Sequence, residues 1–367
     1  MKKHNGVISI WKFIFAIEIL LHHLIYLRPE GNTLAHFGCA SIGVDFFFMV
    51  SGWLLAKKAE SEWKRGDGRP LYEATWSFLL GKIKGVFPYV LFSWLIFLGI
   101  TLIVVKPGTM SVLMSTLDLT FLLAAIKPDY NILGGCWYLS AMMISMLLIY
   151  PLEKKYRKNF SLIIAPLFAV FFGGYMLQNC PSLRDWKAST GHMHVGLLKA
   201  IFEISLGTTA YELSEKLKDI RFKKAGKMLL SLAELGSLGF VLFMNLWYND
   251  VRKYDALWIL LIFFGVSVAF SGRTFFFEIC CNRVFYYLEK LSTALYLNNF
   301  VFVRLCNRTE TLGGLTLRMK MAVVVFGAIA LSVLELPVIA GVKRLLCAAA
   351  PKVKGLFVEG AEEKNPA

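Results

Sequence analysis

The chain has 367 residues, of which 57% are hydrophobic, and its mean hydropathy is +0.58. An apolar content this high excludes a soluble globular domain and indicates a polytopic membrane protein. The formal net charge of +15 comes from short basic clusters between apolar runs. Membrane topology and anionic lipid explain such clusters better than nucleic acid does, so we expect membrane lipid as a partner and no nucleic acid.

Ten apolar runs are long enough to cross about 30 Å of hydrocarbon. They lie at residues 7–27, 37–56, 86–105, 137–152, 160–178, 194–212, 228–247, 255–272, 285–304 and 319–342. This pattern predicts an all-α bundle of about ten transmembrane helices, with one membrane domain at residues 1–342 and a disordered cytoplasmic tail at residues 343–367.

The distribution of basic residues predicts the orientation of the bundle. Of the 40 Lys and Arg residues, 27 fall on the side of the two termini, 9 on the opposite side and the rest inside the runs. By the positive-inside rule both termini are cytoplasmic, and we expect a multi-pass protein of the cell membrane. We interpret residues 111–126, between the third and fourth runs, as a short re-entrant or interfacial helix, because a full crossing would invert the later loops.

The first two runs contain an unusual number of polar side chains. A charged group at bilayer depth costs about 2.5–3.5 kcal/mol on insertion scales, so such groups are rare and usually functional. Those present are Lys12, Glu18, His22, His23, Asp45 and Ser51. A chemical site in this hairpin is therefore the leading hypothesis.

The spacing of these residues indicates how they meet. Lys12 and His23 are three helical turns apart, on one face and about 16 Å from each other. Glu18 and His22 are an i,i+4 pair, in which a carboxylate can orient an imidazole. Asp45 lies about 12 Å and His23 about 6 Å below the same membrane edge, so they can face each other. A histidine held by a carboxylate is suited to act as a general base on a hydroxyl or amine.

A structural interpretation stands beside the chemical one. The histidines and Asp45 could satisfy one another and simply hold the helix hairpin together. Ser51 and Gly52 could serve close helix packing, because small residues let helices approach.

Two segments of the hairpin form a specific pattern. They are Ile10-Trp11-Lys12-Phe13-Ile14-Phe15-Ala16 leading to His22-His23, and Gly43-Val44-Asp45-Phe46-Phe47 followed by Ser51-Gly52. The pattern resembles that of the integral-membrane acyltransferase 3 family. In this register His23 takes the place of the family's histidine, while Lys12 stands where the family usually has arginine.

Three later blocks resemble weaker motifs of the same family. They are Lys82-Ile83-Lys84 before Pro88-Tyr89, the block Trp137-Tyr138-Leu139-Ser140, and Leu291-Ser292-Thr293-Ala294-Leu295-Tyr296 leading to Asn298-Asn299. Asn299 stands where the family has histidine.

The resemblance implies transfer of an acyl group, usually acetyl, from cytoplasmic acyl-CoA to a hydroxyl or amine of a surface glycan or lipid-linked saccharide. Lys12, Lys82 and Lys84 would bind the anionic donor. His23, oriented by Asp45, would act as base, with His22 as the alternative. Ser51, Trp137, Tyr296 and Asn299 are alternative candidates for the oxyanion or substrate contacts.

No metal is expected. A thioester reacts without one, and His192 and His194 have no third ligand nearby. The seven scattered cysteines have no metal-ligand spacing and are interpreted as small core hydrophobes.

Two other classes of function stay open. A secondary transporter would also carry intramembrane charges, but it typically shows paired halves with broken helices in corresponding positions, and no such repeat is found. A non-catalytic partner of an envelope polysaccharide export or assembly system is compatible with the departures at Lys12 and Asn299.

Overall fold

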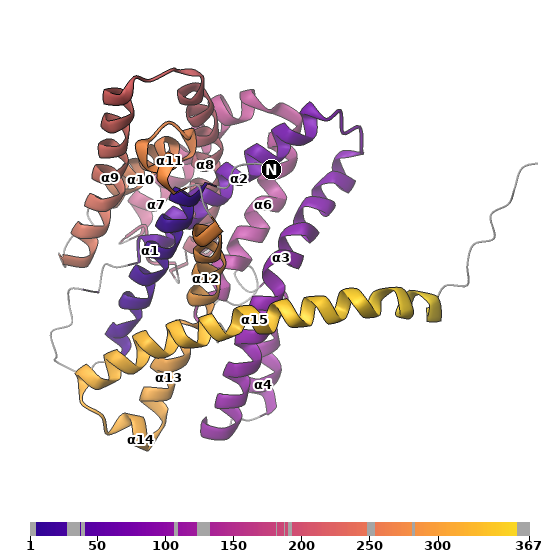
Figure 1. The fold of residues 1–367 in the computed structure, drawn as a ribbon, viewed down its shortest axis with the longest axis vertical. Coiled ribbons are helices and arrows are strands. Elements are labelled where there is room, and N and C mark those ends of the chain that lie inside the picture. Colours follow the sequence, from indigo (N-terminus) through magenta and orange to yellow (C-terminus); the bar gives the residue numbers. More distant parts are fainter. Residues whose placement is uncertain are drawn as a thin grey trace, which may run out of the picture.

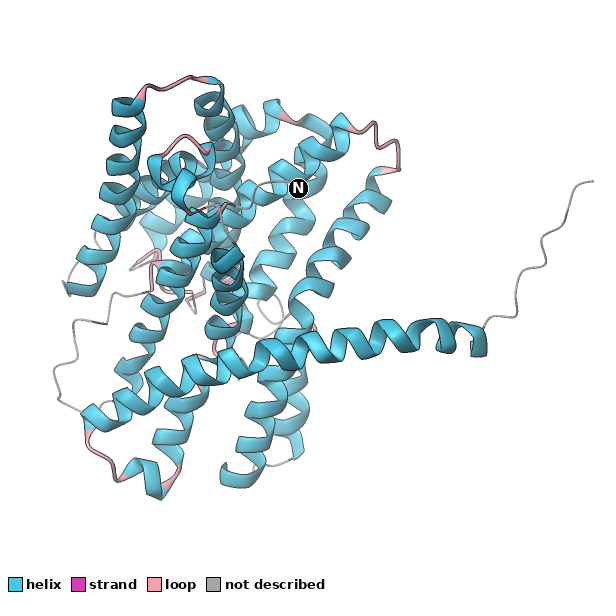
Figure 2. Cartoon of the chain, in the orientation of Figure 1, coloured by secondary structure: helices cyan, strands magenta, loops and turns pink. Residues whose placement is uncertain are grey.

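The computed structural model describes residues 5–27, 37, 41–105, 109–122, 133–180, 182–186, 188–189, 193–247, 254–280 and 283–357. Within these residues the ordered structure is helical, apart from an isolated bridge between Ser189 and His194 (Figure 2). The predicted all-α class is therefore confirmed.

The helices have the following bounds in chain order. The first half contains α1 (Gly6–His23), η1 (Leu24–Leu27), α2 (Gly43–Lys64), α3 (Leu71–Ile100), η3 (Thr101–Val105), α4 (Thr109–Ser115), η4 (Thr116–Leu119), α6 (Cys136–Tyr156), η6 (Phe160–Ile164) and α7 (Ala165–Asn179). The second half contains α8 (Val195–Asp219), α9 (Lys224–Trp247), α10 (Asp255–Ser271), α11 (Phe275–Ile279), α12 (Arg283–Asn298), α13 (Val301–Arg308), α14 (Glu310–Gly313) and α15 (Leu317–Phe357).

Among the described residues, six helical segments are long and apolar enough to cross a membrane. They are Gly6–Leu27, Leu71–Val104, Cys136–Tyr156, Phe160–Asn179, Lys224–Trp247 and Leu317–Arg344. Helices α2 and α8 are outside this set, and both carry ionisable residues that are buried inside the bundle. The protein is thus a multi-pass membrane protein, while ten crossings and cytoplasmic termini stay predictions.

Some helix boundaries differ from those expected. Helix α3 begins at Leu71, well before residue 86, and the ninth run is divided into α12 and α13 by a turn at Asn299 and Phe300. Helix α15 continues to Phe357, into residues 343–367 where a disordered tail was expected; residues 358–367 lie outside the described residues. In the described part of the 111–126 segment, α4 and η4 are too short to cross a membrane, and η4 packs against α3.

Helix α8 is the centre of the bundle. It packs against α2, α6, α7 and α10, while α1 packs against α12 and α15 runs obliquely across α12 and α13 (Figure 1). The α2–α8 crossing is close: a methyl group on Gly52 would lie 2.0 Å from the carbonyl oxygen of Ile204, and one on Gly207 would lie 2.2 Å from that of Met49. Gly52 therefore has the packing role expected of small residues in membrane helices.

A group of ionic contacts ties the α2–α3 connection to α6. Lys154 Nζ donates to Glu62 Oε2 at 3.1 Å and to Asp67 Oδ2 at 2.9 Å. The Tyr150 hydroxyl donates to Glu62, and Arg69 Nε and Nη2 both donate to Asp67 at 2.8 Å. We call these five residues the Lys154 cluster. The Arg69 guanidinium, helped by Lys154, holds the pKa of Asp67 well below its usual range.

Candidate functional site

A cavity of about 340 Å³ lies at the C-terminal end of α1, between α1, α2, α6, α8, α12 and residues 184–186. Its polar lining includes His22, His23, Asp45, Arg184, Asp185 and Lys199, and its aromatic lining includes Trp137, Trp186, Tyr296 and Phe300. We call it the histidine cavity. The predicted residues His22, His23, Asp45, Trp137 and Tyr296 are thus brought together from four helices.

The two histidines are held in different ways. His22 Nδ1 lies 2.9 Å from the carbonyl oxygen of Phe37. Because a carbonyl can only accept, Nδ1 is the protonated nitrogen, which leaves the lone pair of the neutral ring on Nε2. The His23 ring is held by aromatic contacts instead, stacked on Tyr26 at 6.0 Å and edge-on to Phe300 at 5.2 Å between ring centroids. Among the described residues, no group hydrogen-bonds the buried Nδ1 of His23.

Asp45 makes a contact that differs from the one predicted. Its Oδ1 accepts a hydrogen bond of 2.5 Å from Lys199 Nζ, and the same ammonium lies 2.7 Å from Glu203 Oε1. All three side chains are at most 2% exposed. We call Asp45, Lys199 and Glu203 the Lys199 cluster. The expected hydrogen bond from His23 to Asp45 is not formed within the described part of the chain; the close α2–α8 crossing brings the Lys199 ammonium to this carboxylate instead.

Glu18 also has a different partner from the one expected. Its Oε2 accepts from the backbone N–H of Gly43 at 2.9 Å. Gly43 is the first residue of α2, and the first N–H groups of a helix have no intrahelical acceptor. Glu18 therefore fastens α1 to the start of α2 and does not orient His22.

The candidates for oxyanion or substrate contacts fall into different places. Trp137 lines the histidine cavity and stacks in parallel on Trp186, with ring centroids 4.5 Å apart. Tyr296 also lines it, but its hydroxyl donates to the carbonyl of Gly135 at 3.2 Å. The described lining does not include Ser51, whose Oγ donates to Met142 Sδ at 3.3 Å.

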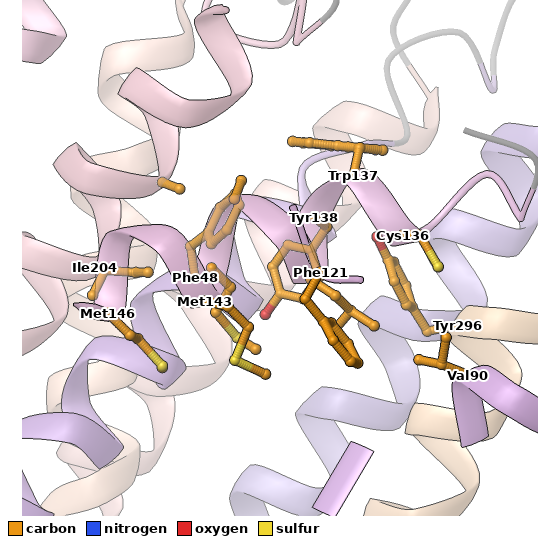
Figure 3. Packing of buried hydrophobic residues seen from close by; sticks show 14 of the residues in the cluster. Phe48, Val90, Phe121, Cys136, Trp137, Tyr138, Met143, Met146, Ile204 and Tyr296 are labelled. Carbon is orange, nitrogen blue, oxygen red and sulfur yellow. The ribbon is translucent and has the colours of Figure 1, made fainter. Parts of the chain in front are cut away.

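A layer of aromatic side chains lies beside the cavity. Tyr138 stands between Phe48 and Tyr296, with centroid distances of 4.5 Å and 5.4 Å (Figure 3). Its hydroxyl lies 3.4 Å from Ser51 Oγ, so Ser51 belongs to this layer.

Asn299 is completely buried at the turn after α12. Neither polar atom of its side chain has a hydrogen-bond partner within the described residues, and it is not in the described lining of the histidine cavity. The structure gives no account of why an amide stands at this position.

A second cavity, of about 560 Å³, lies near the N-terminal half of α1. Its lining carries the charged groups Lys12, Lys57, Glu215, Lys218 and Glu289. We call it the Lys12 cavity. Lys12 Nζ is 2.5 Å from Glu289 Oε1, an ion pair that joins α1 to α12.

The other two predicted donor-binding lysines stand apart from this cavity. Lys82 is half-buried on α3, with its ammonium 5.6 Å from the centre of the Phe78 ring, and Lys84 is exposed. Neither is in the described lining of the Lys12 cavity.

The two cavities share four helices but no lining residue. Helices α1, α2, α8 and α12 contribute to both. The rings of Phe15 and Phe46, stacked at 4.3 Å, lie between the two sets of lining residues along α1 and α2. Since Lys12 and His23 are eleven residues apart on one helix, the two ends of the site are about 16 Å from each other.

The described residues contain no group of three His, Cys, Asp or Glu side chains that could hold a metal ion. His192, one of the two histidines considered for chelation, lies outside the described residues, and His194 is at the start of α8.

A family model for an acyltransferase domain, acyltransferase 3, matches residues 5–335. The chain belongs to this family. The match covers every element that lines the two cavities, so this membrane acyltransferase domain contains both of them. Searches among curated proteins and solved structures gave no match.

Sequence analysis of this acyltransferase-family chain did not single out several residues that lie in or next to the wall of the histidine cavity. Lys199 and Glu203 carried a signal, because they are an i,i+4 pair of opposite charge inside an apolar run. Arg184 carried none: its ion pair of 2.6 Å with Asp255 joins two segments that are distant in the chain. Trp186 was likewise not singled out by any pattern.

Proposed function

We propose that the protein transfers an acyl group, acetyl in the simplest case, from acyl-CoA to a hydroxyl or amine of a surface glycan or lipid-linked saccharide. The family supplies the reaction class. The observation that carries the rest is the placement of Lys12 and His23 at opposite ends of α1, each in its own cavity. We further propose the bacterial cytoplasmic membrane as the location.

The Lys12 cavity suits the donor. Coenzyme A carries phosphates, and this cavity presents the ammonium groups of Lys12, Lys57 and Lys218. Among the residues of α1 that line this cavity, Lys12 is the nearest in sequence to the two histidines. With the phosphates held there, the acyl end of the donor extends along α1, α2 and α12 toward the histidine cavity.

The histidine cavity suits a saccharide acceptor. The flat faces of the Trp137–Trp186 pair offer apolar surface of the kind on which sugar rings pack. Polar groups from His22, His23 and Arg184 surround the same space. Such a mixture of aromatic and polar lining is typical of small-molecule sites.

In the proposed reaction, His23 takes the proton of the acceptor hydroxyl as the oxygen attacks the thioester carbonyl carbon. A C–O bond forms, the C–S bond then breaks, and the imidazolium returns its proton to the departing thiolate. The products are an acyl ester and free coenzyme A. His22, with its proton fixed on Nδ1 by Phe37, stands beside His23 and presents Nε2.

The test uses the purified protein in lipid nanodiscs. Isotopically labelled acetyl-CoA is supplied together with lipid-linked saccharides extracted from cell envelopes, and products are read by mass spectrometry with parallel measurement of free thiol. We expect a labelled acetyl group on a saccharide and an equal amount of released thiol. Release of neither product with acetyl-CoA or succinyl-CoA would contradict the proposal.

A further inference from the structure

The ammonium of Lys199 occupies a special position in the lining of the histidine cavity. It is 1% exposed and comes from the central helix α8, yet it contributes to the wall of the cavity, which His23 and Asp45 also line. A lysine has three N–H donors. One is donated to Asp45 Oδ1, and the ammonium also lies 2.7 Å from Glu203 Oε1, which leaves donor capacity for a group in the cavity.

The two carboxylates make this ammonium a fixed charge. Asp45 holds it from α2, and Glu203 holds it from one turn farther along α8. In apolar surroundings a lone ammonium would lose its proton or move toward water, whereas a paired one stays charged and in place. A preorganised positive donor in a water-poor site is the kind of group that stabilises developing negative charge most strongly.

Three other polar groups in or near the cavity are already engaged. The Tyr296 hydroxyl is used by the Gly135 carbonyl, and Ser51 bonds within the neighbouring aromatic layer. Arg184 is paired with Asp255 and Asn245 through its guanidinium. Lys199 therefore combines a formal charge, a fixed position and a place in the cavity wall.

We propose that Lys199 is a catalytic residue that donates a hydrogen bond to the acyl carbonyl oxygen as it becomes an oxyanion. This rests on the proposed acyl transfer. The acceptor oxygen attacks the carbonyl carbon while His23 takes its proton, and the electron pair of the C=O bond moves to the oxygen facing Lys199. When the pair returns, the C–S bond breaks and the thiolate takes the proton from His23, so that Lys199 ends the cycle unchanged.

The experiment compares Lys199→Gln with Lys154→Gln. Lys154 is a matched control, because its ammonium also lies between two carboxylates but lines neither cavity. We expect Lys199→Gln to lower kcat by about 10²–10³-fold, the loss usual for an oxyanion donor, with the KM values of donor and acceptor within about threefold. Lys154→Gln should keep kcat within about twofold, and Lys199→Arg should recover part of the loss. A kcat within threefold of the parent for Lys199→Gln would overturn the proposal.

A second variant covers the case in which Lys199→Gln does not fold. Replacing a whole buried ionic cluster by neutral groups is often tolerated, because no charge is left unpaired. The triple variant Asp45→Asn, Lys199→Met, Glu203→Gln should therefore fold and yet transfer acyl groups at least about 10²-fold more slowly. Activity of the triple variant near that of the parent would mean that the cluster is only structural. If the parent protein itself releases no thiol from any acyl-CoA, the proposed function fails. That result can be told apart from a failure of the Lys199 proposal, in which the parent is active and the variants are equally active.

Discussion

Two clusters in this molecule place a lysine between two carboxylates, and they are satisfied to different degrees. In the Lys154 cluster, Glu62 and Asp67 also receive hydrogen bonds from Tyr150 and Arg69. In the Lys199 cluster, Asp45 Oδ2 and Glu203 Oε2 have no hydrogen-bond partner among the described residues. The Lys199 cluster is also the more deeply buried of the two.

This difference separates a structural role from a chemical one. A buried polar network stabilises a fold when every member is satisfied, and a partly satisfied network costs stability. Keeping such a network in the wall of a cavity is typical of functional sites, where local rules are broken in favour of chemistry. We therefore expect changes near the Lys199 cluster to affect turnover, and changes near the Lys154 cluster to affect stability.

The largest effect is expected for His23→Ala. Loss of the base should lower kcat by about 10²–10⁴-fold, while membrane insertion and thermal stability stay close to those of the parent. His22→Ala should cost less, about tenfold, because this ring positions the site without taking the proton. The assay is labelled acetyl transfer by each purified variant. Full activity of His23→Ala together with an inactive His22→Ala would move the role of base to His22.

The next largest effect is expected on donor binding at Lys12, near the N-terminal end of α1. Lys12→Glu should raise the KM for the acyl donor by about 10–100-fold, because a carboxylate replaces a charged donor to phosphate, whereas Lys12→Arg should stay near the parent. Lys223→Glu, at an exposed position outside both cavities, makes the same change of charge and should have little effect. An unchanged donor KM for Lys12→Glu would show that the phosphates bind elsewhere.

A moderate effect on stability is expected at the helix crossing that brings Lys199 to Asp45. Gly52→Ala would place a methyl group 2.0 Å from the carbonyl oxygen of Ile204 and should destabilise the protein by about 1–3 kcal/mol. Gly81→Ala is the control: apart from its chain neighbours and its own helix backbone, no described atom lies within 4 Å of its added methyl group, and it should gain about 0.5–1 kcal/mol. Thermal melting in detergent reads both changes. Equal melting temperatures for the two variants would refute a close α2–α8 contact.

The smallest effect is expected for Asp67→Asn in the Lys154 cluster. Since the pKa of Asp67 is lowered in the folded state, its ion pairs stabilise the protein above the pKa of an unfolded Asp, about 3.9, and this contribution is lost as pH falls below it. The variant should melt slightly below the parent at pH 5–8, and the gap should close as pH falls below about 4. Turnover should not change. A difference in melting temperature between parent and variant that grows in acid would contradict a stabilising role of ionised Asp67.

The sequence predicts much of this arrangement because membrane helices are recognisable as long apolar runs. Apolar length identified the helices, and the cost of charge at bilayer depth singled out His22, His23 and Asp45, all of which line one cavity. The placement of Lys12 and His23 in different cavities follows from counting turns along one helix.

Partners across helices were not predictable in the same way. The pairing of Asp45 with Lys199 depends on how closely α2 and α8 cross, which Gly52 and Gly207 allow but do not specify. A local pattern suggested Glu18 with His22, yet the free N–H groups at the start of α2 were the better partner. The sequence thus predicts which groups are buried, whereas tertiary packing decides which of them meet.

We propose that one site joins a donor cavity and an acceptor cavity at opposite ends of α1. Sealed proteoliposomes with uniform protein orientation test it most directly, with labelled acetyl-CoA supplied on one face and the saccharide acceptor on the other. We predict labelled saccharide only when the donor is on the face of the Lys12 cavity and the acceptor is on the face of the histidine cavity. Product that forms only when both substrates are on the same face would contradict the account.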